Sequence, residues 1–342
     1  MLKKTALVYP FSLLYGGVLS VRNLFFDCGV FRQQHVGLPI ISVGNLSVGG
    51  TGKTPQVDWI ADQLKANLSI GILLRGYGRN SKGFVSVAEN SKRETVGDEA
   101  LLYKKNHGSS IDVAVCEKRV LGVAKMVESN PSLDLIILDD AYQHRAIARD
   151  CNILLTDYNN PFWKDYVLPA GRLREFRTGK KRADVIVVTK CPPNLSIEEQ
   201  YSIKRMIAPI DTQKVFFSSI EYGEVISFDA APRSPIENVL LVTGIADAVP
   251  LKNYLAAQFN VNHIAFPDHH NFSQEDVRRV HQIFDIFATE NKVIITTSKD
   301  AMRLLGAEFS ILLKDYPWCY QDMQIHMENE KELITEIKSK IC

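Results

Sequence analysis

Several features that define common protein classes are missing from this chain of 342 residues. Its six cysteines include no C-x-x-C pair, which argues against a zinc site or a disulfide framework and fits a reducing compartment. Lysine and arginine total 40 against 39 aspartates and glutamates, so the net charge of +1 gives no reason to expect a nucleic-acid partner. Repeats and low-complexity tracts are also absent. With 46% hydrophobic residues, the chain can bury the core of one large domain or of two ordinary ones.

The N-terminus lacks a convincing membrane span. The uncharged run from Thr5 to Val21 reaches only the lower limit of spanning length, and Pro10 and paired glycines interrupt it. A cleaved signal peptide fits its charge and length, and a buried helix fits its composition. We favour a helix within residues 1–30 that associates with a membrane interface, with aromatic side chains near the headgroups: Tyr9, Phe11, Tyr15, Phe25 and Phe26.

Apolar runs rich in β-branched residues alternate with helical or loop stretches. This alternation predicts an α/β fold with a mainly parallel sheet and helices on both faces. Strand-prone residues around Tyr222 and Gly223 suggest a β-ribbon, and a Pro-containing linker follows at 230–235. We therefore predict a phosphate-loop domain at 31–213, a ribbon linker at 214–235 and a smaller α/β domain at 236–342. The predicted strands are Ile40–Val43, Ser69–Leu74, Ile111–Val115, Leu133–Leu138, Cys151–Thr156, Val185–Thr189, Val239–Val242 and Lys292–Thr297.

The most informative stretch is a nearly complete phosphate-binding loop. It stands between a predicted strand and a helix-like run, which is the context that such a loop requires. Its glycines let backbone N–H groups point at phosphate oxygens, and the start of the helix adds partial positive charge. Lys53 would reach the β- and γ-phosphates, and the Thr54 hydroxyl would hold Mg²⁺. The stretch predicts that the chain binds a nucleoside triphosphate with Mg²⁺ and works where ATP is, on the cytoplasmic side; its residues are Ser47, Val48, Gly49, Gly50, Thr51, Gly52, Lys53 and Thr54.

Carboxylates stand at two places where they can serve this loop. Asp139 and Asp140 end a buried strand, as an Mg²⁺-supporting aspartate does in nucleotide-hydrolysing folds. His144 follows within a turn, and a structural role is as good an explanation for it as a functional one. Asp98 begins a helix-like run after Gly97. The spacing favours a helix N-cap for Asp98 over a general base, although the two roles are compatible.

Two basic clusters and one histidine motif complete the chemistry. The clusters at 75–79 and 172–182 are either solvated surface or sites for a phosphorylated substrate or anionic lipid. In the run 266–270, adjacent His269 and His270 would make a poor chelate in a strand, so Asp268 and His269 suit an acid–base or orienting role. The segment Thr297–Ala301 is either structural or phosphate-facing.

In this order, the motifs resemble those of the tetraacyldisaccharide 4′-kinase family, the lipid A kinases of Gram-negative bacteria. The resemblance extends from the apolar N-terminus to about residue 304. In this family Ser47 at the start of the loop is ordinary, whereas Ala141-Tyr142 replaces the usual Gly-Phe. The motifs are Ser42-Val43-Gly44-Asn45, the loop through Pro55, Arg75-Gly76-Tyr77-Gly78-Arg79, Val96-Gly97-Asp98-Glu99, Asp139 to His144, Leu168-Pro169-Ala170-Gly171 with Glu175, Phe266 to His270 and Lys299-Asp300-Ala301.

The resemblance implies a phosphate-loop α/β/α domain joined by a β-ribbon to a smaller α/β/α domain. It implies transfer of the γ-phosphate of ATP to the 4′-hydroxyl of a tetraacyl glucosamine disaccharide 1-phosphate, the lipid A precursor, to form lipid IV-A. It also implies peripheral or monotopic attachment at the cytoplasmic face of the inner membrane, with no protein partner.

The same resemblance assigns roles to single residues. Asp98 becomes the catalytic base and His269 its orienting partner. Lys53 stabilises the transferring charge, and Thr54 and Asp139 bind Mg²⁺. The candidates on the substrate side are Arg75, Tyr77, Arg119, Asp140, His144, Arg172 and Glu175.

A phosphate-loop GTPase or metallochaperone, in which hydrolysis drives partner binding, is the alternative. Guanine-binding proteins usually carry Asn/Thr-Lys-x-Asp after a strand. Here Thr189 and Lys190 begin that pattern, but Pro192 stands where the aspartate belongs.

Overall fold

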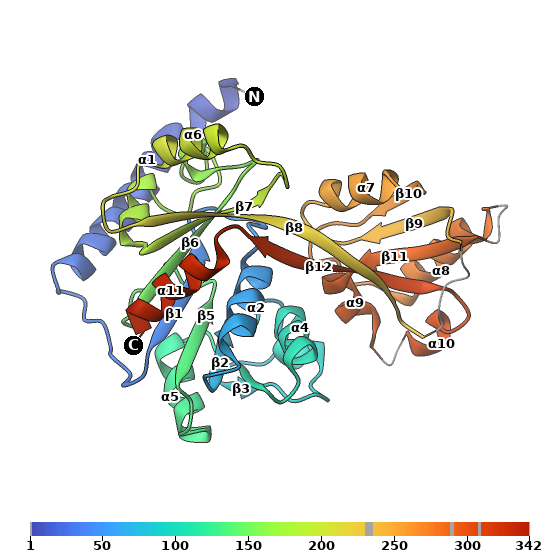
Figure 1. Cartoon of the computed structure of the whole chain (residues 1–342), viewed down its shortest axis with the longest axis horizontal. Helices are drawn as coiled ribbons and strands as arrows, with labels where there is room; N and C mark the ends of the chain where they lie inside the picture. Colours follow the sequence, from blue (N-terminus) through green and yellow to red (C-terminus); the bar gives the residue numbers. More distant parts are fainter. Residues whose placement is uncertain (1, 230–234, 288–290, 307–308, 342) are drawn as a thin grey trace. The chain divides into compact units, whose positions relative to one another are not determined.

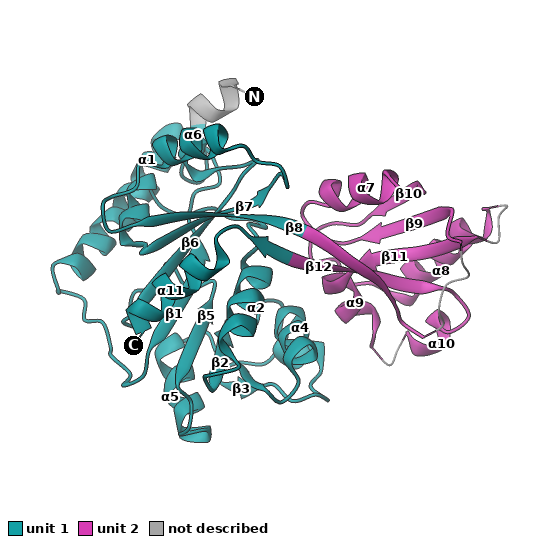
Figure 2. Ribbon diagram, viewed as in Figure 1, with its two compact units in different colours: residues 1–220, 325–342 teal, residues 221–324 magenta. Residues whose placement is uncertain are grey.

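The chain forms two compact units, coloured separately in Figure 2. The structure, a computed structural model, describes residues 2–229, 235–287, 291–306 and 309–341. Unit 1 consists of residues 1–220 and 325–342, and unit 2 of residues 221–324.

The sheet of unit 1 follows from its apolar strands. Its order is β8-β7-β6-β1-β5-β2-β4-β3, and every pair along it is parallel except the short antiparallel pair of β3 with β4. Parallel pairing brings the carboxyl ends of the strands to one edge, with the phosphate loop after the central β1. The strands are β1 (Ile40–Asn45), β2 (Ile70–Leu74), β3 (Val85–Ser86), β4 (Ile111–Val115), β5 (Leu135–Asp139), β6 (Cys151–Asp157), β7 (Val185–Cys191) and β8 (Lys214–Ser227).

Helices cover both faces of this sheet, which makes unit 1 an α/β/α sandwich (Figure 1). α2 (Lys53–Leu64), α4 (Asp98–His107) and α11 (Glu330–Ile341) bury apolar residues on one face. α5 (Arg119–Ser129) and α6 (Ile197–Ile207) cover the other. The remaining helical elements are α1 (Leu2–Asp27), α3 (Arg93–Val96) and the 3₁₀ turns η1 (Phe162–Lys164) and η2 (Arg177–Arg182).

Unit 2 repeats the sandwich on a smaller scale. Its parallel strands have the order β10-β9-β11-β12, with bounds β9 (Asn238–Thr243), β10 (Asn260–Ala265), β11 (Lys292–Thr297) and β12 (Trp318–Met327). One face packs on α8 (Gln274–Asp285), α9 (Ser298–Leu304) and α10 (Ser310–Leu313), and the other on α7 (Val249–Ala256). The predicted α/β/α fold class is therefore confirmed.

The predicted β-ribbon between the units is present, and its second strand is β12. β8 runs without a turn through Tyr222 and Gly223, and its hydrogen-bonded neighbour is β12, far along the chain. The predicted linker lies almost wholly at residues 230–234, outside the described residues. The chain then returns to unit 1, where Leu333 and Ile337 of α11 are buried in its core. The predicted C-terminal domain of 236–342 is thus too long at its end, because the apolar stripe of α11 packs on the first sheet.

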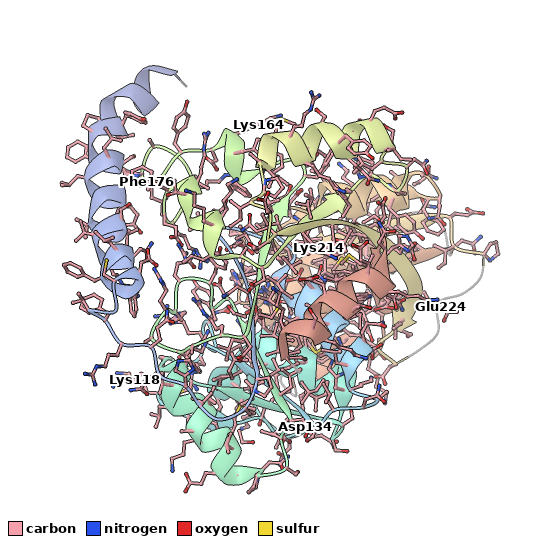
Figure 3. All side chains as sticks on the ribbon, turned by 60° about the vertical axis from the view of Figure 1, so that its left-hand side comes forward. Lys118, Asp134, Lys164, Phe176, Lys214 and Glu224 are labelled. Carbon is pink, nitrogen blue, oxygen red and sulfur yellow. The ribbon has the colours of Figure 1, made fainter. Side chains whose placement is uncertain are left out.

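The N-terminal segment is one helix, α1, held against unit 1 by small residues. An added Cβ at Gly16 would lie 2.5 Å from the Phe176 ring, so a larger residue there would force the ring to move. Figure 3 shows α1 along the edge of the unit, with Phe176 on its inner side. Among the described residues, no helix combines the length and apolar character needed to cross a membrane.

Candidate active site

The phosphate loop connects β1 to α2 at the carboxyl edge of the sheet. Gly49 and Gly52 have φ of 108° and 79°, values that glycine adopts without steric cost. The start of the loop is anchored where Val48 N donates to Arg172 O at 2.8 Å. Its middle is anchored where Asn45 Nδ2 donates to Thr51 Oγ1 at 2.6 Å. The loop therefore bends at left-handed glycines and is fixed by one backbone and one side-chain hydrogen bond.

Asp139 lies beside the loop because β5 pairs with β1, Val43 opposite Asp139. The Tyr103 hydroxyl lies 2.9 Å from Asp139 Oδ2 and 3.2 Å from Thr54 O, so it joins the two residues predicted to bind Mg²⁺. The other carboxylate oxygen, Oδ1, is buried and has no hydrogen-bond partner among the described residues. Burial, reinforced by the charges of Glu99 and Asp140, raises the pKa of Asp139. A buried, unsatisfied oxygen with a raised pKa fits a site that gains a cation, so these residues suit Mg²⁺.

Asp140 connects the loop to the neighbouring surface. Its Oδ1 lies 3.7 Å from Lys53 Nζ, and Arg174 binds it in a bidentate pair at 3.0 and 3.1 Å. Burial alone would raise the pKa of Asp140, but the two cations outweigh it and lower that pKa. Asp140 also has φ of 47°, in the left-handed region, so this pairing holds a strained backbone.

Asp98 is the first residue of α4 and is only 4% exposed. The N-cap is Gly97, so the interpretation of Asp98 as the cap is wrong. Gly97 turns with φ of 87°, and an added Cβ there would lie 2.9 Å from Tyr77 O. Only glycine fits this bend, and the helix begins at Asp98, one residue earlier than an Asp98 cap would give. An acid in the first helical turn is favoured by the helix dipole.

A pocket of about 270 Å³ lies next to Asp140. Its polar wall is cross-linked: Gln143 Nε2 donates to Asn45 O at 2.9 Å and to Glu175 Oε1 at 3.1 Å. Burial and nearby arginines lower the pKa of His144 to about 4, so this imidazole is neutral at physiological pH. The lining residues are Tyr15, Leu19, Arg22, Asn23, Arg75, Asp140, Gln143, His144, Arg174 and Glu175.

The pocket gathers some of the predicted substrate-side residues and not others. Arg75, Asp140, His144 and Glu175 line it. The remaining three do not: Tyr77 is 63% exposed, Arg119 is buried with its guanidinium on two backbone carbonyls, and Arg172 pairs with Asp165 at 3.0 Å.

Sequence reasoning missed several residues of this wall. Arg174 lies in the basic cluster 172–182, and Arg22 and Asn23 lie near the C-terminal end of α1. The signal available for Arg174 was its place beside Glu175. No local pattern distinguishes it from Arg172.

His269 belongs to unit 2, on the loop after β10. Its φ is 58°, and its backbone N–H donates to Gly244 O at 3.0 Å. Arg303 Nη2 lies 3.2 Å from His269 Nδ1, while Arg303 Nη1 donates to Gly244 O and, at 2.6 Å, to Asp300. A guanidinium has no acceptor, so Nδ1 accepts this hydrogen bond and the proton stands on Nε2. The segment Thr297–Ala301 is thereby explained: fully buried Asp300 holds the arginine that orients His269.

Comparison with known proteins gives one consistent result. A family model described as tetraacyldisaccharide-1-P 4′-kinase (LpxK) matches residues 4–342. A tetraacyldisaccharide 4′-kinase of Cytophaga hutchinsonii is 38% identical over 339 residues, which is 98% of this chain and 95% of the relative. One from Flavobacterium johnsoniae is 40% identical over 302 residues, 87% of each protein. The solved "apo" form of LpxK from Aquifex aeolicus in complex with ATP has a TM-score of 0.75 at 29% identity and covers 100% of both chains.

Proposed function

The chain belongs to the tetraacyldisaccharide-1-P 4′-kinase family, as the motifs indicated, and we infer that it phosphorylates the lipid A precursor with ATP. The reaction transfers the γ-phosphate to the 4′-hydroxyl of a tetraacyl glucosamine disaccharide 1-phosphate. One observation carries the inference at the level of the site. Asp140 both contacts the phosphate-loop lysine and lines the adjacent pocket, so a nucleotide and a second substrate can meet there.

The loop supplies the charge stabilisation. Phosphoryl transfer depends on positioning and on electrostatic stabilisation of the phosphate oxygens. Lys53 is held near Asp140 at the start of α2, where backbone N–H groups would also face the phosphates of a bound nucleotide. Thr54 and Asp139 would hold Mg²⁺, which would supply positive charge to offset the negative charge of the nucleotide's phosphates.

Asp98 is the proposed base that takes the proton of the attacking hydroxyl. It is buried at the start of α4, the helix whose Tyr103 contacts Asp139. His269 is its proposed orienting partner. The Arg303 contact supports this role, because a proton fixed on Nε2 lets the imidazole donate to a carboxylate.

The pocket is the proposed site of the disaccharide headgroup. Arg75 and Arg174 bring positive charge to its wall, which suits a substrate that carries a phosphate. Arg22 and Asn23 of α1 also line it. An acylated substrate entering beside α1 would therefore keep its acyl chains near this helix.

We propose attachment to the cytoplasmic face of the inner membrane through α1. Its outer face exposes apolar side chains, among them Phe11 at 64%, Leu14 at 69% and Val18 at 63%. Burial of such side chains at an interface favours binding.

The test is a transfer assay with the purified protein, γ-labelled ATP and a detergent-dispersed disaccharide 1-phosphate lipid. The expected product is a lipid with one additional phosphate. The matched control is a lipid whose 4′-hydroxyl is blocked, which should stay unlabelled. Release of free phosphate without lipid labelling would instead support a nucleotide switch.

A further inference from the structure

The end of β7 contacts the phosphate loop. Thr189 and Lys190 stand there, next to an irregularity in the pairing of β7 with β8 between Val188 and Cys191. Lys190 has φ of 57°, a left-handed conformation that costs energy in a residue other than glycine. Such a strained backbone conformation persists only where the surrounding contacts hold the residue in it.

The side chains of Thr189 and Lys190 donate hydrogen bonds to two consecutive carbonyl groups of the loop. Lys190 Nζ donates to Gly50 O at 2.5 Å, and Thr189 Oγ1 donates to Thr51 O at 2.9 Å. The Thr189 contact is sheltered, because Thr189 is 2% exposed, whereas the Lys190 contact with Gly50 lies at the surface, although the Lys190 side chain is only 16% exposed. Hydrogen bonds that water cannot replace define a conformation more strongly than exposed ones.

The lysine is itself held by a fixed carboxylate. Asp157 Oδ2, at the end of β6, lies 2.9 Å from Lys190 Nζ. The other oxygen of Asp157 accepts from the backbone N–H groups of Asn159 and Asn160 at 2.8 and 3.1 Å. Asp157 at the end of β6 thus fixes the ammonium group of Lys190, and this group donates to the loop that follows β1.

Holding these carbonyls determines where the following N–H groups point. A trans peptide is planar, with its C=O and the next N–H directed oppositely. A Thr51 carbonyl turned toward β7 directs the Gly52 N–H away from β7. The Gly52 N–H immediately precedes Lys53, in the part of a phosphate loop that meets the β-phosphate.

We propose that Thr189 and Lys190 are positioning residues that hold the phosphate loop in its ATP-binding shape. Their effect falls on nucleotide binding and leaves the lipid pocket unchanged. This inference rests on the proposed function only in that the loop binds ATP.

Matched substitutions at Thr189 test the hydroxyl. Thr189→Val keeps the shape of the side chain and removes its donor, whereas Thr189→Ser keeps the donor. We expect Thr189→Val to raise the KM for ATP about fivefold to tenfold, in line with loss of one sheltered hydrogen bond. Thr189→Ser should stay within about twofold of the parent, and the KM for the lipid should be unchanged in both, because the effect acts through the loop.

Two substitutions at Lys190 separate its side chain from its backbone. Lys190→Gly suits the left-handed φ and should fold well, yet it loses the ammonium group. Lys190→Met loses the same group and keeps the strain. Both should raise the KM for ATP about tenfold or more and reduce the gain in melting temperature that ATP produces. Lys214→Met, at an exposed lysine that pairs with Glu332 and Glu336, is the control and should change neither quantity.

The outcomes are separable. An unchanged KM for ATP in Lys190→Gly and Thr189→Val would overturn the inference. So would equal increases in the KM for ATP and for lipid with a lowered melting temperature, because they would show a general structural role. Failure of the proposed function looks different: the parent protein would bind ATP, with the same dependence on Lys190, and transfer no phosphate to lipid.

Discussion

The phosphate loop and the His269 loop handle left-handed backbone in opposite ways. In the phosphate loop, Gly49 and Gly52 take the positive φ angles, so the backbone bends at positions that carry no side chain. In unit 2 the positive φ falls on His269 itself, and Arg303 with buried Asp300 supports it. Glycine takes the positive φ where we propose that the backbone meets phosphate. A strained residue with buried support serves where a side chain is needed in one orientation.

The first prediction tests whether His269 needs that orientation for catalysis. Asp98→Ala and His269→Ala should each lower kcat by about 10²–10⁴-fold, the range of a general base. Groups that act as one unit are not additive, so the double variant should fall little below the worse single variant. The measurement is kcat for all three variants and the parent. Losses that multiply would show that the two residues act independently.

For the phosphate loop, we predict that substitution of Lys53 also lowers kcat. Lys53→Ala should lower kcat by about 10²–10³-fold, as removal of a preorganised charge does. The melting temperature should change little, because Lys53 supports charge in a loop and buries little apolar surface. Lys53→Arg keeps the charge but not the shape, and should recover part of the loss. Near-normal kcat in Lys53→Ala would refute the loop as the phosphate site.

The contact of Arg303 with His269 can be weakened while buried Asp300 keeps a positively charged partner. Arg303→Lys keeps a positive charge beside Asp300, so it avoids leaving that carboxylate unpaired. A lysine cannot reproduce the fork that reaches Gly244 O, Asp300 and His269 together. We expect kcat to fall about tenfold while the KM for ATP and for lipid stay constant. The effect should vanish in a His269→Ala background, and persistence there would show that Arg303 acts by another route.

The same contrast explains how far the sequence could lead. The glycine loop, the strand ending in Asp139 and the apolar strands are local patterns, and the structure has them where they were predicted. The support of His269 is not local: Asp300 lies in a motif that the sequence marked, but nothing in the sequence connects Asp300 or Arg303 with His269. Likewise, an amphipathic helix such as α11 fits any apolar sheet face, so its return to unit 1 could not be predicted. Arg172 and Arg174 differ only in which carboxylate they meet, Asp165 in their own loop or Asp140 at the end of β5.

The smallest catalytic effect is expected at α1, whose inner and outer faces differ. Its inner side lines the pocket with Arg22 and Asn23, so deletion of the helix would damage the pocket as well as any anchor. Leu14→Asp and Val18→Asp instead change only exposed positions, 69% and 63% accessible. Each adds a charge and removes apolar surface at a membrane interface, so vesicle binding should weaken by about tenfold or more. Activity on detergent-dispersed lipid should stay within about twofold, since neither side chain lines the pocket.

Co-sedimentation with anionic vesicles measures membrane binding, and a parallel assay in detergent measures activity. Unchanged vesicle binding would move the anchor away from α1, most directly to the basic stretch 172–182. An equal loss in detergent would mean that the outer face of α1 contributes to the fold or to the substrate site itself.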